Sequence, residues 1–143
     1  VYRWDKPQSA LKRWEKISSK PVYLSEVGAD SYMKISQSGF EKGENQRAQA
    51  TANANIIDAV LSHSDLTSGL LIFSFTDGLW KAGNPNQQDI GGWAPNSSGV
   101  PYDGAPNEEY WGIVDIERNK KQTFDAIKER FTNFSINNKK LQE

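Results

Sequence analysis

The stretch Lys20-Pro-Val-Tyr-Leu-Ser-Glu26-Val-Gly28 decides the fold, because it places a carboxylate where a short apolar run ends. The residue before a proline is pushed toward extended backbone, and the run after Pro21 is too short for a helix. We therefore expect a buried strand over residues 21–26. A charge at the end of a buried strand suits an active-site acid better than a surface residue, so Glu26 is the first candidate functional residue.

A second apolar run, Gly69-Leu-Leu-Ile-Phe-Ser-Phe75, repeats the arrangement, with an acid following at Asp77. Both runs are continuously apolar instead of alternating, which is typical of parallel strands covered on both faces. We therefore expect the acids at the ends of the two strands to lie together at one site.

Helical spacing of apolar residues predicts three helices around these strands. They cover residues 8–19, a segment from Ala48 to about residue 62, and a segment in which Phe124, Ile127 and Phe131 share one face while Lys120 and Lys121 belong to the polar side. The alternation predicts an α/β fold with parallel strands. Two strands do not make a stable sheet. Either 112–116 is a further strand, or the chain is a piece of a larger barrel or sheet.

Composition excludes several classes of protein. A net charge of −1, from 17 basic and 18 acidic residues, argues against a nucleic-acid partner or an anionic membrane surface. No cysteine is present, which excludes disulfides and thiolate chemistry. The single histidine, His63, lies in a polar helix exit, where a solvated role is favoured over catalysis or metal binding. We expect no cofactor, no metal site and no membrane insertion in this segment.

Two sequence patterns bear on localisation. The N-terminus has no apolar core of signal-peptide length and no initiator Met, so it reads as the middle of a protein. Asn96 and Asn133 each begin an N-glycosylation acceptor pattern, which fits a secreted or cell-surface glycoprotein.

The segment from Thr76 to Trp111 lacks periodicity but is rich in aromatic residues, which argues against disorder. Tryptophans in a polar loop beside strand-end acids favour a sugar site, although a small core that pins the loop is an equal alternative. The paired acids Glu108 and Glu109 are candidate ligands for a substrate hydroxyl or a cation, and a solvated or capping role is the favoured alternative. The candidate aromatic residues are Trp80, Trp93, Tyr110 and Trp111.

Several of these motifs together resemble the C-terminal part of a retaining (β/α)8-barrel glycoside hydrolase of the β-glucanase and glucanosyltransferase type. This type belongs to the clan that also holds β-galactosidase and β-glucuronidase. The resemblance spans about residues 1–131 and rests on Val1-Tyr-Arg3, the 20–32 segment, the 69–75 run, Trp80-Lys-Ala-Gly83 and Asn107-Glu-Glu-Tyr-Trp-Gly-Ile-Val114.

This resemblance implies that residues 1–135 are the C-terminal portion of the barrel, with 136–143 as a polar and ragged tail. Residues 21–26 become strand seven, residues 69–75 become strand eight, and Glu26 becomes the nucleophile. The acid/base lies on strand four, outside this chain, so the chain alone is expected to be inactive. The implied ligand is a β-glucan-like carbohydrate. The implied binding residues are Tyr2, Arg3, Asp77, Trp80, Lys81, Trp93, Glu108, Tyr110 and Trp111.

The chain departs from the pattern at Gly78-Leu79, where the related sequences have a second acid and a second tryptophan. This departure favours an alternative function, a non-catalytic extracellular structural or carbohydrate-binding glycoprotein that keeps the barrel as a scaffold. A weaker alternative is an unrelated α/β domain in which Glu26 simply ends a strand.

Overall fold

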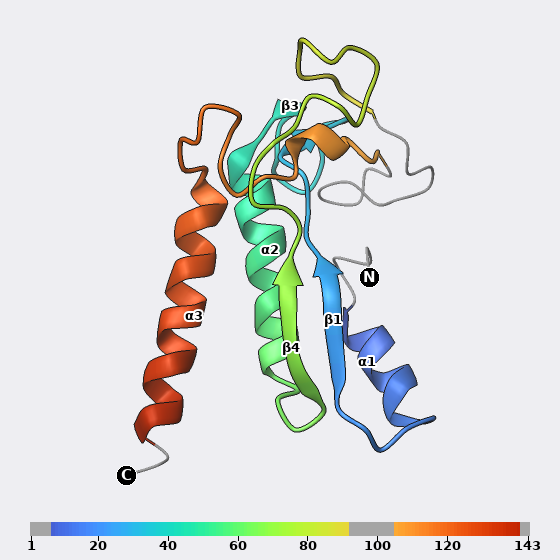
Figure 1. Cartoon of the computed structure of the whole chain (residues 1–143), viewed down its shortest axis with the longest axis vertical. Coiled ribbons are helices and arrows are strands. Elements are labelled where there is room, and N and C mark those ends of the chain that lie inside the picture. Colours follow the sequence, from blue (N-terminus) through green and yellow to red (C-terminus); the bar gives the residue numbers. More distant parts are fainter. Residues whose placement is uncertain (1–6, 92–104, 141–143) are drawn as a thin grey trace.

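The structure is a computed structural model that describes residues 7–91 and 105–140. Its polar loops gather at one end of a parallel strand pair (Figure 1). The elements in chain order are α1 (Pro7–Glu15), β1 (Val22–Val27), β2 (Tyr32–Met33), β3 (Gly43–Glu44), α2 (Gln46–Leu61), β4 (Thr67–Ile72), the 3-10 helix η1 (Glu108–Tyr110) and α3 (Gln122–Lys140).

Strands β1 and β4 pair in parallel, as their apolar runs predicted. Leu24 lies opposite Leu70 and Val27 opposite Ile72, and the pairing is irregular between Leu24 and Val27. The carboxyl ends of both strands therefore lie at one edge, where Figure 1 shows the two arrowheads side by side. This edge is where the loops that follow β1 and β4 begin.

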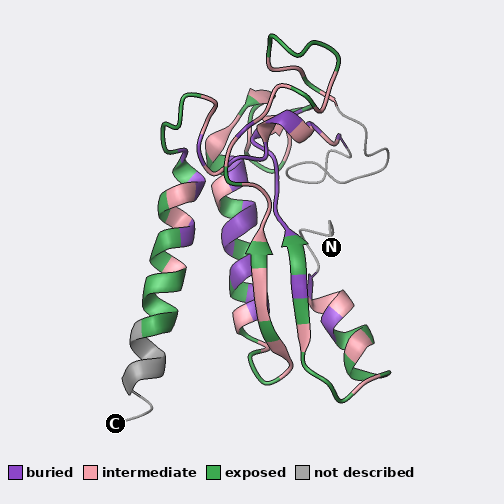
Figure 2. Cartoon of the chain, viewed as in Figure 1, coloured by how far each residue is buried: buried purple, intermediate pink, exposed green. Residues whose placement is uncertain are grey.

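The core lies on one face of this strand pair, between the strands and helices α1 and α2. Its buried members are Leu11, Leu24, Val27, Ala29, Met33, Ala48, Ala52, Ile56 and Val60. The opposite face is open among the described residues, with Tyr23 50% and Leu71 56% exposed. Figure 2 shows this contrast between buried α2 and the exposed positions of the two strands. Parallel sheets are normally covered on both faces, so the open face is unusual for such strands.

Helix α2 forms where the sequence predicted, and the small or branched residues whose helical spacing predicted it are buried, namely Ala48, Ala52, Ile56, Ala59 and Val60. Its N-terminus is capped by Asn45, whose side-chain oxygen accepts a hydrogen bond from Ala48 N at 3.0 Å. Helix α3 packs beside α2, and Asn53 donates to the Thr123 hydroxyl at 2.9 Å in the buried contact. The two helices thus form one layer behind the strands.

Several boundaries differ from the expectations. Helix α1 ends at Glu15, before residue 19, and Ile17 beyond it is 78% exposed. Strand β4 ends at Ile72, so Phe73 to Phe75 already belong to the following loop. Residues 112–116 form no strand and contribute only isolated bridges through Val114. Helix α3 continues through Lys140, so the segment expected to be a ragged tail is helical to that residue.

None of the helices within residues 7–91 and 105–140 combines the length and the apolar character needed to cross a membrane.

Candidate functional site

Glu26 occupies the second-to-last position of β1, at the edge where the strands end. It falls inside the irregular part of the β1–β4 pairing, and it is exposed although Val27 beside it is buried. Glu26 is therefore a solvent-exposed acid at the edge where the two strands end.

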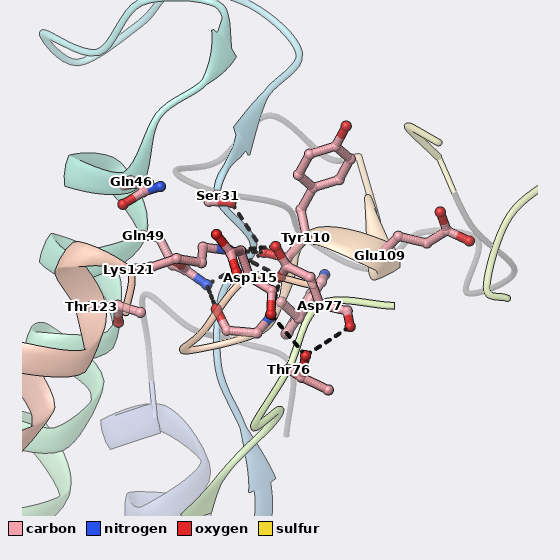
Figure 3. Close-up of polar contacts among 12 residues, drawn as sticks. Ser31, Gln46, Gln49, Thr76, Asp77, Glu109, Tyr110, Asp115, Lys121 and Thr123 are labelled. Atoms are coloured by element: carbon pink, nitrogen blue, oxygen red, sulfur yellow. Dashed lines mark hydrogen bonds and ion pairs between the residues drawn. The ribbon is translucent and has the colours of Figure 1, made fainter. Parts of the chain in front are cut away.

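The most deeply buried charges of the described chain lie in the loops next to this edge. Lys121 Nζ lies 3.0 Å from Asp77 Oδ1 and 3.2 Å from Asp77 Oδ2. The same ammonium donates to the Tyr110 carbonyl at 3.1 Å. Asp77 Oδ1 also accepts a hydrogen bond from Gly112 N at 2.7 Å. Figure 3 shows Asp77, Lys121 and Tyr110 converging from the loop after β4, the start of α3 and η1.

Burial sets the electrostatics of this ion pair. It raises the pKa of Asp77 above the ordinary value of 3.8, and the attraction of Lys121 offsets the rise only in part. Burial likewise lowers the pKa of Lys121 below the ordinary 10.5, against the pull of Asp77. Desolvation outweighs attraction on both sides, so the ion pair holds the loops in place at an electrostatic cost.

Glu109 organises the long loop that follows β4. Its two carboxylate oxygens accept backbone hydrogen bonds from Ala82 at 2.8 Å and from Asp89 at 2.7 Å. Gln88 then joins this group to the ion pair, since its amide donates to Asp77 Oδ2 at 3.2 Å and to the Glu109 carbonyl at 2.9 Å. The carboxylate of Glu109 therefore ties down the loop through backbone groups, and the Gln88 amide connects it to the ion pair.

Asn107 connects the loops of the two strands. Its amide nitrogen donates to Asp30 Oδ2 at 2.8 Å and to the Tyr32 carbonyl at 3.0 Å, both after β1. Its amide oxygen accepts from Gly91 N at 2.9 Å, after β4. The Asn107 backbone is left-handed, with φ of 35°, a conformation that asparagine tolerates better than most residues.

The buried contacts of Asp77, Lys121, Glu109 and Asn107 form a scaffold for the loops, and close packing around Gly112 completes it. A side-chain carbon at this position would lie 2.0 Å from Asp77 N and 2.3 Å from the Val114 carbonyl oxygen, so only glycine fits. Gln49 of α2 reaches the Gly112 and Ala29 carbonyls, donating to each at 3.0 Å. The fully buried side chain of Gln49 thereby fastens both loops to the helix layer.

An exposed aromatic ring stands apart from this buried scaffold. Trp80 is 63% exposed, and the ammonium of Lys81 lies 4.4 Å from its ring centroid. Lys81 also pairs with Glu108 at 3.3 Å, which holds the Lys81 side chain beside the ring. An indole held in this way offers an apolar surface on which the flat face of a sugar ring can stack.

The structure divides the candidate residues of the sequence into three groups. Asp77 and Trp111 belong to the scaffold, with exposures of 6% and 2%, and direct substrate contact for them stays a prediction. Trp80, Lys81 and Glu108 form one contact group, in which Trp80 is exposed and the other two side chains are partly buried. The candidates Tyr2, Arg3, Trp93 and Asn96 lie outside the described residues, and the glycosylation candidate Asn133 lies exposed on α3.

Tyr110 joins the scaffold to the accessible surface. Its ring lies 5.1 Å from the ring of Tyr32, and it is partly exposed. Burial raises the pKa of the Tyr110 hydroxyl, assisted by nearby acidic groups. The hydroxyl therefore stays protonated at neutral pH and remains a hydrogen-bond donor.

Sequence reasoning missed the residues that build the scaffold. Lys121 was expected on the polar side of a helix, and the structure instead buries it, with 1% of the residue exposed. It stands in the run Lys120-Lys121 before a helix, a pattern usual for a solvated surface, so no sequence signal marked it. Asn107 and Gln49 also lacked a distinguishing signal, whereas Glu109 was a candidate ligand and the structure instead places it in backbone hydrogen bonds. Within the described ranges, no group of three or more acidic, His or Cys side chains is arranged to hold a metal ion.

No protein-family model and no curated protein sequence matches this chain. Several solved structures have a similar fold. The chain superposes on a GH2 β-galacturonidase from Eisenbergiella tayi bound to galacturonate with a TM-score of 0.57, at 19% identity over 91% of this chain and 21% of that one. For the β-glucuronidase of Bifidobacterium dentium complexed with coumarin-3-O-glucuronide, the TM-score is 0.54, at 22% identity over 87% and 16% of the two chains.

The β-D-glucuronidase of Dictyoglomus thermophilum gives a TM-score of 0.57, at 18% identity over 90% of this chain and 19% of that one. The chain thus spans about a fifth of the length of these structures, which are all glycosidases. At these identities the likeness establishes a shared fold with a segment of glycoside hydrolases.

Proposed function

We propose that this chain is the C-terminal portion of a (β/α)8 barrel in a retaining glycoside hydrolase, with β1 and β4 as strands seven and eight and Glu26 as the nucleophile. The observation that carries the proposal is the position of Glu26, exposed at the carboxyl edge of a parallel strand pair whose fold is shared with glycosidases. Barrel enzymes place their catalytic residues at this end of the strands.

The open face of the strand pair supports the barrel part of the proposal. Tyr23 and Leu71 leave an apolar surface exposed on the side opposite α1 and α2. In a barrel, this side faces the interior, where side chains from the other strands fill the space. The remainder of the barrel, contributed by the same parent protein, would cover both residues.

The proposed reaction has two steps. A carboxylate oxygen of Glu26 attacks the anomeric carbon of a β-glycoside, and the bond to the leaving oxygen breaks as an acid from the remainder of the barrel donates its proton to that oxygen. Water or a sugar hydroxyl then gives a proton to the same acid/base and attacks the anomeric carbon, which releases the Glu26 carboxylate. Retaining chemistry requires the two carboxyl groups to be about 5 Å apart.

The scaffold would serve this reaction by fixing the loops above the strand ends. Asp77, Lys121, Asn107 and Glu109 tie the loops after β1 and β4 to each other and to α3. Trp80 would contribute a stacking surface for a neighbouring sugar unit. The proposed substrate is a β-linked glucan-like polysaccharide. The enzymes with a similar fold are named for uronic-acid glycosides, as a β-galacturonidase and a β-glucuronidase.

A second candidate is a non-catalytic carbohydrate-binding or structural protein that keeps the barrel. The observation in its favour is that Asp77 is held within the scaffold, next to Gly78-Leu79, where related enzymes carry functional groups. In this alternative, Trp80 still contacts sugar, and Glu26 has no chemical role.

The two candidates are separated by assaying β-glucan hydrolysis and transfer in the full parent protein. We expect Glu26→Gln to lower kcat by about 10³-fold or more, because a nucleophile lost from a covalent mechanism is not replaced. Glu15→Gln, an exposed acid at the end of α1, is the matched control and should leave kcat unchanged. Equal activity of Glu26→Gln and wild type would remove Glu26 from catalysis. A wild type that binds glucan without turnover would favour the second candidate.

A further inference from the structure

A groove of about 370 Å³ lies between the last turn of α2 and the middle of α3. Figure 1 shows the last turn of α2 at the end of the molecule opposite the two strand arrowheads, so the groove is remote from the edge that carries Glu26. Its volume is enough for one sugar ring. Asp58 and Leu61 line it from α2, and Glu129, Arg130, Asn133 and Phe134 line it from α3.

Asn133 brings a modification signal to this groove. It begins the acceptor pattern Asn133-Phe134-Ser135 for N-linked glycosylation, in which any residue except proline stands in the middle. All three residues are exposed on α3. A glycan is bulky and requires a surface position in the folded protein. The structure provides such a position at Asn133.

An ion pair fixes the polar side of the groove. Arg130 Nε donates to Asp58 Oδ1 at 2.9 Å, and Arg130 Nη2 donates to Asp58 Oδ2 at 3.1 Å. Two parallel bonds of this kind hold both side chains in one geometry. The Asp58 side chain is 54% exposed, and each carboxylate oxygen can accept more than one hydrogen bond. Asp58 can therefore accept a hydrogen bond from a sugar hydroxyl while it stays paired with Arg130.

Phe134 supplies the apolar side of the groove. Its ring is 38% exposed, and Leu61 lies at the same groove from the neighbouring helix. A pyranose ring has an apolar face that packs on aromatic surface and hydroxyl groups that need polar partners. The groove offers both kinds of surface next to the asparagine that would carry the sugar.

We propose that Asn133 is an N-glycosylation site and that the first N-acetylglucosamine of its glycan lies in this groove against Phe134. The sugar donor is a lipid-diphosphate-linked oligosaccharide. The Asn133 amide nitrogen bonds to the anomeric carbon of the donor, the bond from that carbon to the lipid diphosphate breaks, and the amide nitrogen loses one proton. The inference goes beyond the proposed function and does not require that Glu26 be catalytic.

The first test is mass spectrometry of peptides from the parent protein secreted by eukaryotic cells. The peptide that contains Asn133 should carry a glycan in most molecules, and peptide N-glycosidase should remove it. Ser135→Ala should abolish the modification, because the acceptor pattern is lost. Ser135→Thr and Thr132→Ala change exposed positions and keep the pattern, so both controls should keep the glycan.

The second test measures how fast peptide N-glycosidase releases the glycan from the folded protein. Release should be about threefold or more faster from Phe134→Ala than from wild type, because a sugar packed on the ring shields its own linkage. Thr132→Ala should match wild type, and all variants should release the glycan equally after unfolding. Asp58→Asn, at an exposed position, should also speed release and keeps the test decisive if Phe134→Ala does not fold.

Two results would overturn the proposal. One is an unmodified Asn133 peptide from the secreted parent protein. The other is equal release from folded wild type, Phe134→Ala and Asp58→Asn, because the first sugar would then not lie in the groove. Neither measurement depends on glycosidase activity, so failure here is distinct from failure of the proposed function.

Discussion

Lys121 Nζ lies 3.0 Å from Asp77 Oδ1, and both side chains are almost wholly buried, with 1% and 3% of their surfaces exposed. The pair joins the loop after β4 to the residue that precedes α3, and Lys121 adds the Tyr110 carbonyl to the same cluster. Three segments distant in sequence are thereby held at the strand edge that carries Glu26. This buried contact is one of several that hold the loops above the candidate nucleophile, beside those of Asn107 and Gln49.

We predict that Lys121→Met destabilises the parent protein by about 3–5 kcal/mol, because it leaves the Asp77 carboxylate buried without its counter-charge. Chemical denaturation measures the free energy of unfolding. Lys120→Met is the matched control, since Lys120 is exposed, and it should cost less than about 1 kcal/mol. Adding Asp77→Asn to Lys121→Met should recover part of the loss, and a double variant less stable than Lys121→Met would contradict the role of the ion pair.

The same variant should show a distinctive pH dependence. Asp77 has a raised pKa in the folded protein, and loss of Lys121 removes the main group that lowers it, so the folded state of Lys121→Met binds the Asp77 proton more tightly than the unfolded state. Asp77 therefore contributes most stability below its ordinary pKa of 3.8, and this contribution is lost as pH rises through the folded-state pKa. The deficit of Lys121→Met relative to wild type should be smallest in acid and grow toward neutral pH. A deficit that shrinks as pH rises would contradict this account.

Gly112→Ala should be strongly disruptive, because the added carbon would lie 2.0 Å from Asp77 N and 2.3 Å from the Val114 carbonyl oxygen. Backbone on both sides has no room to move without breaking the Gly112 hydrogen bond to Asp77. We expect a loss of about 3 kcal/mol or more, the range of severe overpacking. Gly83→Ala is the control, since its nearest contact would be an ordinary 3.6 Å to Asp89. Similar stabilities for the two variants, measured by thermal unfolding, would show that the close approach at Gly112 is not constraining.

Trp80→Ala should act on substrate binding and leave stability nearly unchanged. The ring is 63% exposed, so its removal costs little packing, but the stacking surface beside Lys81 disappears. We expect KM for a β-glucan to rise about tenfold, in line with about 1–2 kcal/mol for one lost aromatic contact, while kcat changes less. Trp14→Ala on α1 should instead lower the stability and leave KM nearly unchanged, because Trp14 is partly buried and its indole donates to the Lys20 carbonyl. An unchanged KM in Trp80→Ala would show that the Trp80 ring is not a stacking surface for the substrate.

Sequence reasoning identified the parts of the fold that depend on local pattern. The apolar runs around Leu24 and Leu70 predicted adjacent parallel strands, and the small residues from Ala48 to Val60 predicted the packed face of α2. The helix could be predicted because one of its faces packs on the core, which leaves a periodic signature in the sequence, and the strands could be predicted because their apolar runs are short and continuous. The barrel itself is not represented in the described residues and stays a proposal.

The roles of the scaffold residues Lys121 and Asn107 could not be predicted from the sequence, for a physical reason. Lys121 and Asn107 gain their roles from contacts with Asp77 and Asp30, which are far away along the chain, and such contacts leave no periodic pattern. A buried lysine in a lysine run looks like a surface residue until its partner is known. The position of Glu26 at the strand edge could be predicted because it depends on the strand that carries it, and its catalytic role stays a proposal.

The most direct test of the central claim is covalent trapping of the nucleophile in the parent protein with a 2-deoxy-2-fluoro-β-glucosyl fluoride, followed by peptide mass spectrometry. The electron-withdrawing fluorine slows both steps, and the reactive leaving group lets the glycosyl-enzyme form and accumulate. We predict one added glycosyl group on the peptide that contains Glu26, and no label in Glu26→Gln. A label on another carboxylate, or an active enzyme that is never labelled at Glu26, would contradict it.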